Sequence, residues 1–593
     1  MTIKTGTCWQ EPACPHGVAR VPRKQRQLAD SVANETFNRA VTALDQPFVE
    51  DLQQQMTAST GRPRAHTWRT LLTVLLIDAL ERPGELLCTR ACHVAERLTP
   101  RQRARIGLTG RLTYRQLTGA VEALGRAATE TADPSTGEVG SKVSLSDLLT
   151  NIVRAPIPDD LLSHTTVAID ATDLETYYSP HGRTNARAGN RAAQGAATAE
   201  DQSLVPSRRQ RGSDLPVLGA DGRMQYTVDP DAREGYRAGK NLKPKETFIG
   251  FNLHIAVGVP PEGKRAQAAL AQGLVFCPAG ADSDRAGLQV IDALTRQGDA
   301  VDRVCVDRGY SYRLAAGWAR ELQRRGIDQT IDLHATQRTT HPGPVPGTIF
   351  VDGHLFIDSL PQNLRDPGGF PLMQSAEERL QRIAAYDARV FYAFSKLGQP
   401  NRTRGTQRYR GPAVTGKVRC PNNPASMRRD PATRPTTNCA GRECYCSRTI
   451  TLGPGDYLRE RQDHLYGTTK WAKDYGRRNH VESLNASLKI HHGGLRRGSI
   501  RVQTLQRTGL LAALVLAATN IRVLAEAYAR DISAPAPASA SEQQSQAAGG
   551  TGRRPRRTRT PKRGTGPHRA KGPPPRTPTD TTDWVPATKA HKR

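Results

Sequence analysis

Between residues 160 and 334 the sequence alternates short apolar runs with amphipathic stretches, and this alternation limits the fold more than any other feature of the chain. Runs such as GFNLHIAV and VDRVCV are typical of buried strands, whereas RAGLQVIDALTRQ and YRLAAGWARELQRRG have the apolar spacing of helices. Strands that alternate with helices predict an α/β sheet with parallel connections.

Two apolar runs end at an aspartate: TTVAIDATD at Asp170 and VDRVCVDRGY at Asp307. Ligands of such sheets gather at the carboxyl ends of strands, and a carboxylate there is costly unless a cation or hydrogen bonds compensate it. Capping of a turn is the structural alternative for each aspartate. Asp173 is a rival to Asp170, but it would face the other side of a continuing strand, so we favour Asp170.

A third group of chemically reactive side chains recurs in YGRRNHVESLNASLK, from Tyr475 to Lys489. At about 100° per residue, Arg478, Glu482 and Lys489 fall within roughly 60° of Tyr475 around a helix axis. The pattern therefore predicts one helix face on which a carboxylate lies among two cations and a phenol. A solvated helix face with ordinary i,i+4 ion pairs is the alternative.

With these residues together, the sequence resembles the DDE transposases of bacterial insertion sequences, in the group with a Y-x2-R-x3-E-x6-K signature. Tyr475, Arg478, Glu482 and Lys489 match this signature without a gap, and they follow both aspartates in the order Asp, Asp, Glu. The IDAT segment, the GFNLHIAV strand and DRGY also match. The resemblance covers most of residues 160 to 525.

The resemblance implies an α/β RNase H-like catalytic core in which the strands of Asp170 and Asp307 are adjacent, with a β-rich insertion domain before the helix of Glu482. It implies a DNA transposase that binds the terminal repeats of its insertion sequence, cleaves at the ends and joins them to target DNA. The family works as a paired-end assembly, so a homodimer on DNA is implied.

For this chemistry we expect Asp170, Asp307 and Glu482 to bind two Mg²⁺ or Mn²⁺ ions, because hard oxygen ligands suit these cations. Two such ions stabilise the attacking and leaving oxygens of an in-line phosphoryl transfer. Arg478 and Lys489 would bind phosphates, and Tyr475 would add a hydrogen bond or a stacking contact. The alternatives are a metal-dependent DNA nuclease without strand transfer and a non-catalytic basic DNA-binding protein.

The net charge of the chain favours nucleic acid as the partner. The 593 residues carry a formal charge of +29, so a polyanion such as double-stranded DNA, at transposon ends and targets, is expected. An anionic membrane surface is the second candidate, but the longest apolar runs are too short to cross a bilayer. Without an apolar signal segment, a cytoplasmic, nucleoid-associated protein is expected.

Composition and periodicity divide the chain into six parts. We expect a flexible N-terminus (1–27), an all-helical DNA-binding domain (28–156), the core in two parts (160–334, with a loop insertion at 179–245, and 470–530), an insertion domain (335–469) and a disordered basic tail (531–593). The helical domain could equally be a bundle with a basic outer face. The tail adds nonspecific DNA affinity or is a solvated extension.

Ten cysteines in a chain of this length are too few for a disulfide scaffold. Cys420, Cys439, Cys444 and Cys446 could form a structural zinc site, although their spacing is loose and fits chance as well. Cys8, Cys14 and His16 form a weaker group. For His254 and for Trp471 we favour a place in the core over a role as a ligand or a base-stacking residue.

Overall fold

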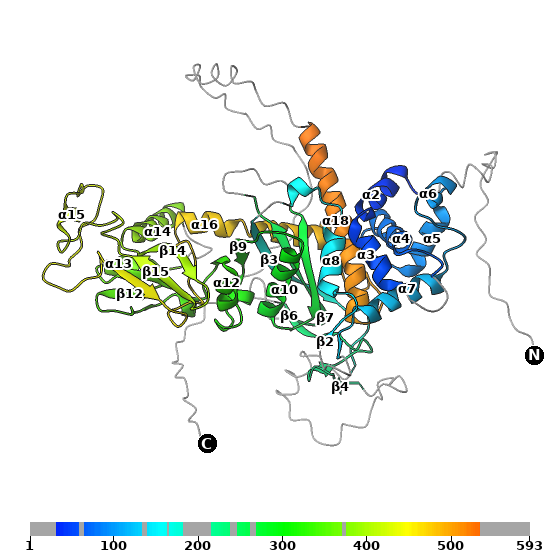
Figure 1. Cartoon of the computed structure of the whole chain (residues 1–593), viewed down its shortest axis with the longest axis horizontal. Helices are drawn as coiled ribbons and strands as arrows, with labels where there is room; N and C mark the ends of the chain where they lie inside the picture. The colour runs from blue at the N-terminus through cyan, green and yellow to red at the C-terminus, as the bar shows by residue number, and fades with distance from the viewer. Residues whose placement is uncertain are drawn as a thin grey trace, which may run out of the picture. The chain divides into compact units, whose positions relative to one another are not determined.

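The computed structural model describes residues 31–57, 64–132, 139–162, 165–181, 215–237, 246–260, 268–369 and 375–533. They form an α/β structure with N-terminal helices, a mixed sheet that contains parallel strands flanked by helices, and small antiparallel sheets (Figure 1). This confirms the predicted α/β class. The predicted N-terminus 1–27 and the tail from residue 534 onward lie outside the described residues.

The N-terminal region is helical, as its apolar spacing predicts. Thr99 and Thr113 begin two of these helices with capping boxes, in which the threonine side chain and a glutamine three residues later satisfy free backbone N–H groups. One detail of the all-helical prediction is wrong, because β1 (Thr131–Ala132) and β2 (Val139–Gly140) form a two-stranded sheet where the proline and glycines of TADPSTGEVG cannot continue a helix. The helices are α2 (Asn34–Leu44), α3 (Pro47–Met56), α4 (Trp68–Glu81), α5 (Cys88–Arg97), α6 (Pro100–Arg105), α7 (Tyr114–Ala127) and α8 (Leu145–Arg154).

The central sheet combines antiparallel and parallel strands. β3 lies between β7, to which it is antiparallel, and β9, to which it is parallel, and β10 continues parallel to β9. β6 and β8 pair with successive parts of the other edge of β7, both antiparallel. The strands are β3 (Thr166–Glu175), β6 (Arg233–Arg237), β7 (Glu246–Gly258), β8 (Ala271–Pro278), β9 (Arg303–Val306) and β10 (Asp328–Ile331).

Helices cover both faces of this sheet. Val167 and Ile169 of β3 pack with α10 (Ser283–Arg296) and α12 (Ala319–Arg325). Ala168, on the opposite face, belongs to the buried cluster that includes α8, α17 (Asn479–Ala486) and α18 (Leu505–Ser533). The alternation of side chains along a strand thus places successive β3 residues in two different cores.

The core on the α18 side extends without a break into the N-terminal helices. It runs from Phe37 in α2 and Leu72 in α4, through Leu149 in α8, to Leu253 in β7 and Leu514 in α18. The described residues up to Ile532 belong to one compact unit. The helices of the predicted domain 28–156 therefore share their hydrophobic core with the sheet.

α18 is the one helix among the described ranges with the length and apolarity of a membrane span. Its segment Leu505–Arg530 has a mean hydropathy of 1.7 in the most apolar window, and 89% of that window is buried inside the protein. Asn520, in the middle of the helix, donates to the carbonyl oxygens of Val153 and Ala271. Such burial is the pattern of a core helix.

Two three-stranded antiparallel sheets dominate residues 335–469, in agreement with the β-rich character expected there. The apolar segment ARVFYAF is not a strand: α14 ends at Ala388, and a 3₁₀ turn follows at Arg389–Phe391, where buried Arg389 pairs with Asp352 at 2.6 Å. The elements are β11 (Thr340–Pro342), β12 (Thr348–Val351), β13 (His354–Ile357), α13 (Gln362–Arg365), α14 (Ala376–Ala388), β14 (Ser395–Asn401), β15 (Thr406–Arg410), α15 (Pro424–Met427) and β16 (Thr449–Leu452).

The stretch 179–245, expected as a loop, contributes an edge strand to the central sheet. β6 (Arg233–Arg237) pairs with β7, and a small hairpin of β4 (Val217–Leu218) and β5 (Met224–Gln225) precedes it. An edge strand is only partly buried, so its sequence, REGYR, contains no apolar run. The periodicity of the sequence therefore did not reveal this strand. The rest of this stretch, at 182–214 and 238–245, lies outside the described residues.

Candidate active site

Asp170 and Asp307 each follow one member of a residue pair on two adjacent parallel strands. Ile169 of β3 is in register with Val306 of β9, and each aspartate is the next residue in the chain. β9 ends at Val306, whereas β3 continues to Glu175, so the apolar run that ends at Asp170 is shorter than the strand itself. Parallel pairing thus brings together two carboxylates that are 137 positions apart in the numbering.

Each residue of the DRGY segment has a distinct structural task. Asp307 caps the short helix α11 (Arg308–Ser311) by accepting from the Gly309 N–H at 2.8 Å. Arg308 forms an ion pair with Asp332. Tyr310 is buried, and its hydroxyl lies 2.8 Å from Nδ1 of His254. Turn capping is the role expected of Asp307 under the structural alternative, and in the described part of the chain its second oxygen, Oδ2, accepts no hydrogen bond.

His254 belongs to the core below the aspartates, as favoured from the sequence. It is fully buried on β7 opposite Ala171 of β3, and burial lowers its pKa to about 4. Burial, followed by the charges of Asp170 and Asp307, raises the pKa of Tyr310 well above its usual value. This pair therefore stays uncharged at neutral pH.

The segment Tyr475–Lys489 is not the single helix that its spacing predicts. α16 (Thr469–Gly476) ends next to Tyr475, α17 begins at Asn479, and a π-helical turn occupies Ser487–His491. At the break, Arg478 N–H bonds to Tyr475 O at 3.0 Å, three residues back instead of four. Gly476, a poor helix former, lies at this point.

Glu482 and Arg478 nevertheless meet beside the first aspartate, because α17 packs on β3 and β7. Arg478 forms an ion pair with Glu482, and its Nη1 lies 3.9 Å from Oδ1 of Asp170. The side chain of Glu482 is 50% exposed, whereas that of Asp170 is 18% exposed. The guanidinium of Arg478 therefore lies within ion-pair distance of both carboxylates.

The electrostatics of Asp170 link the three acids. Burial, together with the charges of Asp307 and Glu482 and against the opposing effect of Arg478, raises the pKa of Asp170 to about 6. Burial alone would lower the pKa of Arg478, but Tyr475, Glu482, Asp170 and Asp307 raise it above its usual value. The arrangement concentrates negative charge that a cation would stabilise.

Asn485 is a site residue that the sequence reasoning missed. It lies three residues after Glu482 on α17, and its Nδ2 donates to Oδ2 of Asp170 at 3.0 Å. Its own Oδ1 is buried and has no hydrogen-bond partner. The i,i+3 spacing from Glu482 is a signal that could have identified it.

Lys489 binds the rival aspartate. Its Nζ lies 2.6 Å from Oδ1 of Asp173, which also accepts from Arg237 of β6. Burial alone would raise the pKa of Asp173, but these two cations hold it below its usual value. Asp173 is therefore compensated by protein cations.

Tyr475 lies against the core. The Tyr475 ring stacks on the ring of Trp471, with the two centroids 5.2 Å apart. The guanidinium carbon of Arg478 lies 5.6 Å from the centroid of the Tyr475 ring. Trp471 is buried, and its Nε1 donates to the carbonyl oxygen of Ile331 at 3.0 Å. Burial raises the pKa of Tyr475 to about 12. Trp471 thus has the core position favoured from the sequence, and Tyr475 contacts the guanidinium of Arg478 through its ring.

The three carboxylates are close but do not form a compact ligand set. In the described part of the chain, one group of three or more His, Cys, Asp or Glu residues has ligand atoms that all lie within 4.8 Å of one another, and it consists of cysteines. Asp170, Asp307 and Glu482 are more widely spread. The Arg478 guanidinium lies within ion-pair distance of Asp170 and Glu482.

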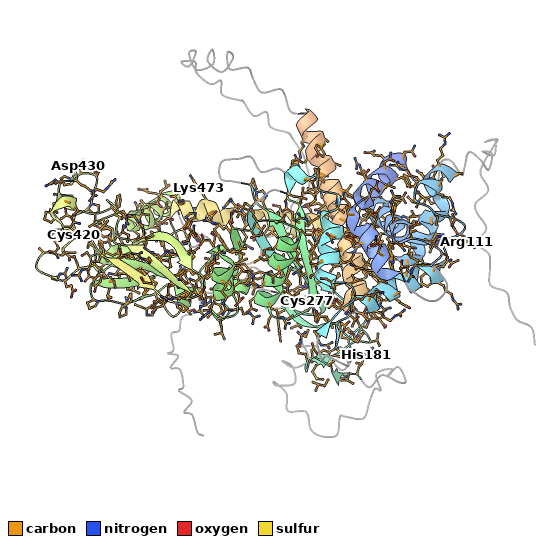
Figure 2. All side chains as sticks on the ribbon, viewed as in Figure 1. Arg111, His181, Cys277, Cys420, Asp430 and Lys473 are labelled. Atoms are coloured by element: carbon orange, nitrogen blue, oxygen red, sulfur yellow. The ribbon has the colours of Figure 1, made fainter. Side chains whose placement is uncertain are left out.

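That cysteine group is Cys420, Cys439, Cys444 and Cys446, and these four residues could hold a zinc ion. They are free thiols in the β-rich region; Figure 2 labels Cys420 there. The residues were predicted as a set, and the fold brings them together despite their loose spacing. The other candidate group, Cys8, Cys14 and His16, lies outside the described residues.

Comparison with known proteins finds no match: no protein-family model, no curated protein and no solved structure is similar to this chain. The geometry of the site and the sequence motifs are therefore the basis for any functional conclusion.

Proposed function

We propose that the protein is a DDE-type DNA transposase that binds the ends of its own insertion sequence, cleaves there and joins the ends to target DNA by metal-dependent phosphoryl transfer. One observation supports this most: Asp170 and Asp307 directly follow Ile169 and Val306, which are in register on the adjacent parallel strands β3 and β9, and the charge of Glu482 from α17 acts on Asp170. These three residues stand in the order that the motif resemblance requires.

The sheet supports an RNase H-like core. The resemblance implies that the strands of the two aspartates are neighbours, and β3 and β9 are paired and parallel. The helix of Glu482 follows a β-rich region in sequence and packs on β3 and β7. This arrangement fits an enzyme that collects its acids from distant segments of the chain beside two neighbouring parallel strands.

The donor chemistry of Asp170, Asp307 and Glu482 supports divalent cations such as Mg²⁺ or Mn²⁺ as the cofactor. The donors are carboxylate oxygens, which these hard cations prefer. Arg478 is within ion-pair distance of Asp170 and Glu482. Its positive charge therefore neutralises part of the carboxylate charge that a bound metal ion would neutralise. When bound, two such ions would activate the attacking oxygen and stabilise the leaving oxygen.

The chain's own residues prepare this site. Asn485 fixes Oδ2 of Asp170 through its Nδ2 donor, and the Gly309 N–H fixes Oδ1 of Asp307. Arg478, which is partly buried against Tyr475, is positioned to bind a DNA phosphate beside the acids. Lys489 needs to leave Asp173 before it can bind a phosphate.

The charge of +29 supports double-stranded DNA as the partner, both as the element ends and as the target. In the N-terminal helices, Arg101, Arg105, Arg111 and Arg115 are exposed around the α6 and α7 turn, where they can contact phosphates. A homodimer on paired ends in the nucleoid-containing cytoplasm follows from the same proposal.

The test is an incubation of the purified chain with linear DNA that carries the element ends, in Mg²⁺. We expect nicks at the element boundary. Glu482→Gln keeps the shape of the side chain but removes its charge, so cleavage should fall by about 10³-fold while DNA binding persists. Glu50→Gln on α3 makes the same chemical change at an exposed position and should cleave normally.

Retained cleavage by Glu482→Gln would remove this residue from the site. A pre-cut element end separates the enzymatic alternatives: a transposase joins it to a target plasmid, whereas a nuclease does not. Binding of ends without any nick in Mg²⁺ or Mn²⁺ would support a non-catalytic DNA-binding protein.

A further inference from the structure

We propose that Cys420, Cys439, Cys444 and Cys446 bind one structural Zn²⁺, and that this ion holds an arginine-rich segment, residues 419–448, as a surface that contacts DNA phosphates. We call this segment the zinc loop. Its DNA partner rests on the proposed function, whereas its metal does not.

The sulfur positions match a tetrahedral thiolate site. Sγ of Cys420 lies 3.7 Å from that of Cys444, and Sγ of Cys439 lies 3.5 Å from that of Cys446. All four sulfurs lie within 4.8 Å of one another. Zn–S bonds of about 2.3 Å in a tetrahedron place the sulfurs about 3.8 Å apart. A disulfide needs about 2.05 Å, so these separations fit shared coordination better than pairwise oxidation.

The surroundings are those of a closed structural site. Cys420 and Cys446 are 0% exposed and Cys439 is 2% exposed. Asn422 Nδ2 donates to Sγ of Cys444 at 3.4 Å, and the hydroxyl of Ser359 lies 3.4 Å from Sγ of Cys439. Donors of this kind orient thiolate ligands and stabilise their negative charge. No open coordination position is needed for such a role.

The zinc loop needs a cross-link because it has almost no core of its own. Between Cys420 and Cys439, residues 421–438 contain no buried apolar side chain and one short helix, α15. A bridge between Arg419 and Thr436 closes the base of this excursion. Loops of this length without a core are uncommon in ordered proteins. The cysteines flank the excursion, so one ion would tie both of its ends to the segment that leads into β16; Figure 2 labels Cys420 and, in the excursion, Asp430.

The charge of the loop and of the strand before it indicates the partner. Residues 408–448 contain nine Arg and Lys residues against Asp430 and Glu443, which gives +7 before the thiolates and the metal are counted. Four thiolates and one Zn²⁺ add −2, so +5 remains in 41 residues of a chain whose 593 residues carry +29. This density of positive charge favours a polyanion.

Several of these cations are available to a ligand. Arg428 and Arg442 of the loop are exposed. Arg408 and Arg410 are exposed on one side of β15, in register with exposed Thr451 and Thr449 of β16. Gly411 N–H bonds to Arg448 O at 3.0 Å, so the loop returns directly beside these strands. Guanidinium and hydroxyl donors on one surface are the groups that bind DNA phosphates without reading sequence.

The metal is tested on the full chain, purified without chelators, by elemental analysis and by release with a mercurial reagent. We expect one zinc per chain. The double variant Cys439→Ser/Cys446→Ser should retain less than a tenth of it. Cys88→Ala/Cys92→Ala, which removes two cysteines of α5, should keep its zinc. Native wild-type protein without zinc, whose four loop thiols react with a thiol reagent, would overturn the proposal.

The surface is tested with Arg428→Gln/Arg442→Gln, compared with Arg285→Gln/Arg324→Gln on α10 and α12, which changes the net charge equally. Full zinc content shows that the loop is folded in each variant. We expect the loop variant alone to bind duplex DNA about threefold to tenfold more weakly and to lower the slope of log affinity against log salt by about 1 to 2. Equal affinities for the two variants would overturn the DNA surface. A protein that holds zinc and binds DNA in this way but never cleaves would refute the proposed function alone.

Discussion

The carboxylates of Asp170, Asp307 and Glu482 and the cysteines before β16 are both groups of acidic side chains, yet they differ in what surrounds them. Glu482 is half exposed, and Arg478 lies between it and Asp170. Three of the four cysteines are buried, and their sulfurs lie close enough to share one ion. The first site is open and loosely held, whereas the second is closed and compact.

If both proposals hold, this difference separates two cation roles by ligand hardness and access. Exposed oxygen ligands suit ions that exchange and meet a substrate, whereas buried thiolates suit an ion that stays. The predictions below test this separation, beginning with the largest effect.

The largest expected effect is on cleavage. Asp307→Asn should slow end cleavage by about 10³-fold, which corresponds to about 4 kcal/mol of transition-state stabilisation. The asparagine Oδ1 can still accept from the Gly309 N–H, so α11 should keep its cap. Single-turnover cleavage of a labelled element end measures the rate. Zinc content should equal that of the wild type, and a cleavage rate within tenfold of the wild type would argue against the open site.

The closed site should govern local stability. Cys446→Ser should increase the rate of tryptic cleavage after Arg428 and Arg429 by about 100-fold at low protease concentration, which corresponds to a loss of roughly 3 kcal/mol in the free energy of local opening. Chelation of Mg²⁺ should leave this rate unchanged. Mass spectrometry of the fragments locates the cuts. A variant as resistant as the wild type would show that the loop is ordered without its metal.

A pH-dependent stability difference should mark the open site. The pKa of Asp170 is about 6 in the folded protein, above the 3.8 of an unperturbed aspartate. Between these values the folded protein keeps a proton that the unfolded chain releases, so stability falls as the pH rises through this window. Asp170→Asn should therefore be more stable than the wild type by roughly 2 kcal/mol at pH 7, with a difference near zero at pH 4. Denaturation midpoints in chelator at four pH values measure it, and a difference independent of pH would contradict the assignment.

The smallest effect concerns the cation that holds Asp173. Lys489 and Asp173 are 27% and 24% exposed, so solvent screens their ion pair, and Lys489→Met should change the free energy of unfolding by less than about 1 kcal/mol. If Lys489 binds a phosphate, the affinity for DNA should fall about threefold to tenfold. Lys470→Met, an exposed change on α16, is the control. A stability loss with unchanged DNA affinity would assign Lys489 a structural role.

The sequence predicted the strands of both aspartates because each is a short apolar run with a clear end. It also predicted the N-terminal helices through their apolar spacing, and it named the four cysteines as a set. The sequence did not predict which sulfurs lie nearest each other. Cys420 lies beside Cys444, and Cys439 lies beside Cys446, because of the path of the zinc loop, which no local sequence pattern encodes.

Other parts of the site depended on tertiary structure. Tyr475 to Lys489 fits one helix by spacing alone, but i to i−3 hydrogen bonds near Gly476 and a π turn at Ser487–His491 interrupt it. Asn485 was missed because an amide acquires significance only beside a buried carboxylate. β6 was missed because an edge strand needs no apolar run.

The buried cluster that joins α2, α4 and α8 to α18 has an evolutionary consequence. A recognition module on a flexible linker can be exchanged by recombination as a unit. Helices whose apolar side chains interlock with those of the central sheet cannot be exchanged in this way without exposing the apolar surfaces of both the helices and the sheet. On the proposed function, changes in DNA preference would then accumulate through single substitutions on the outer surface of these helices.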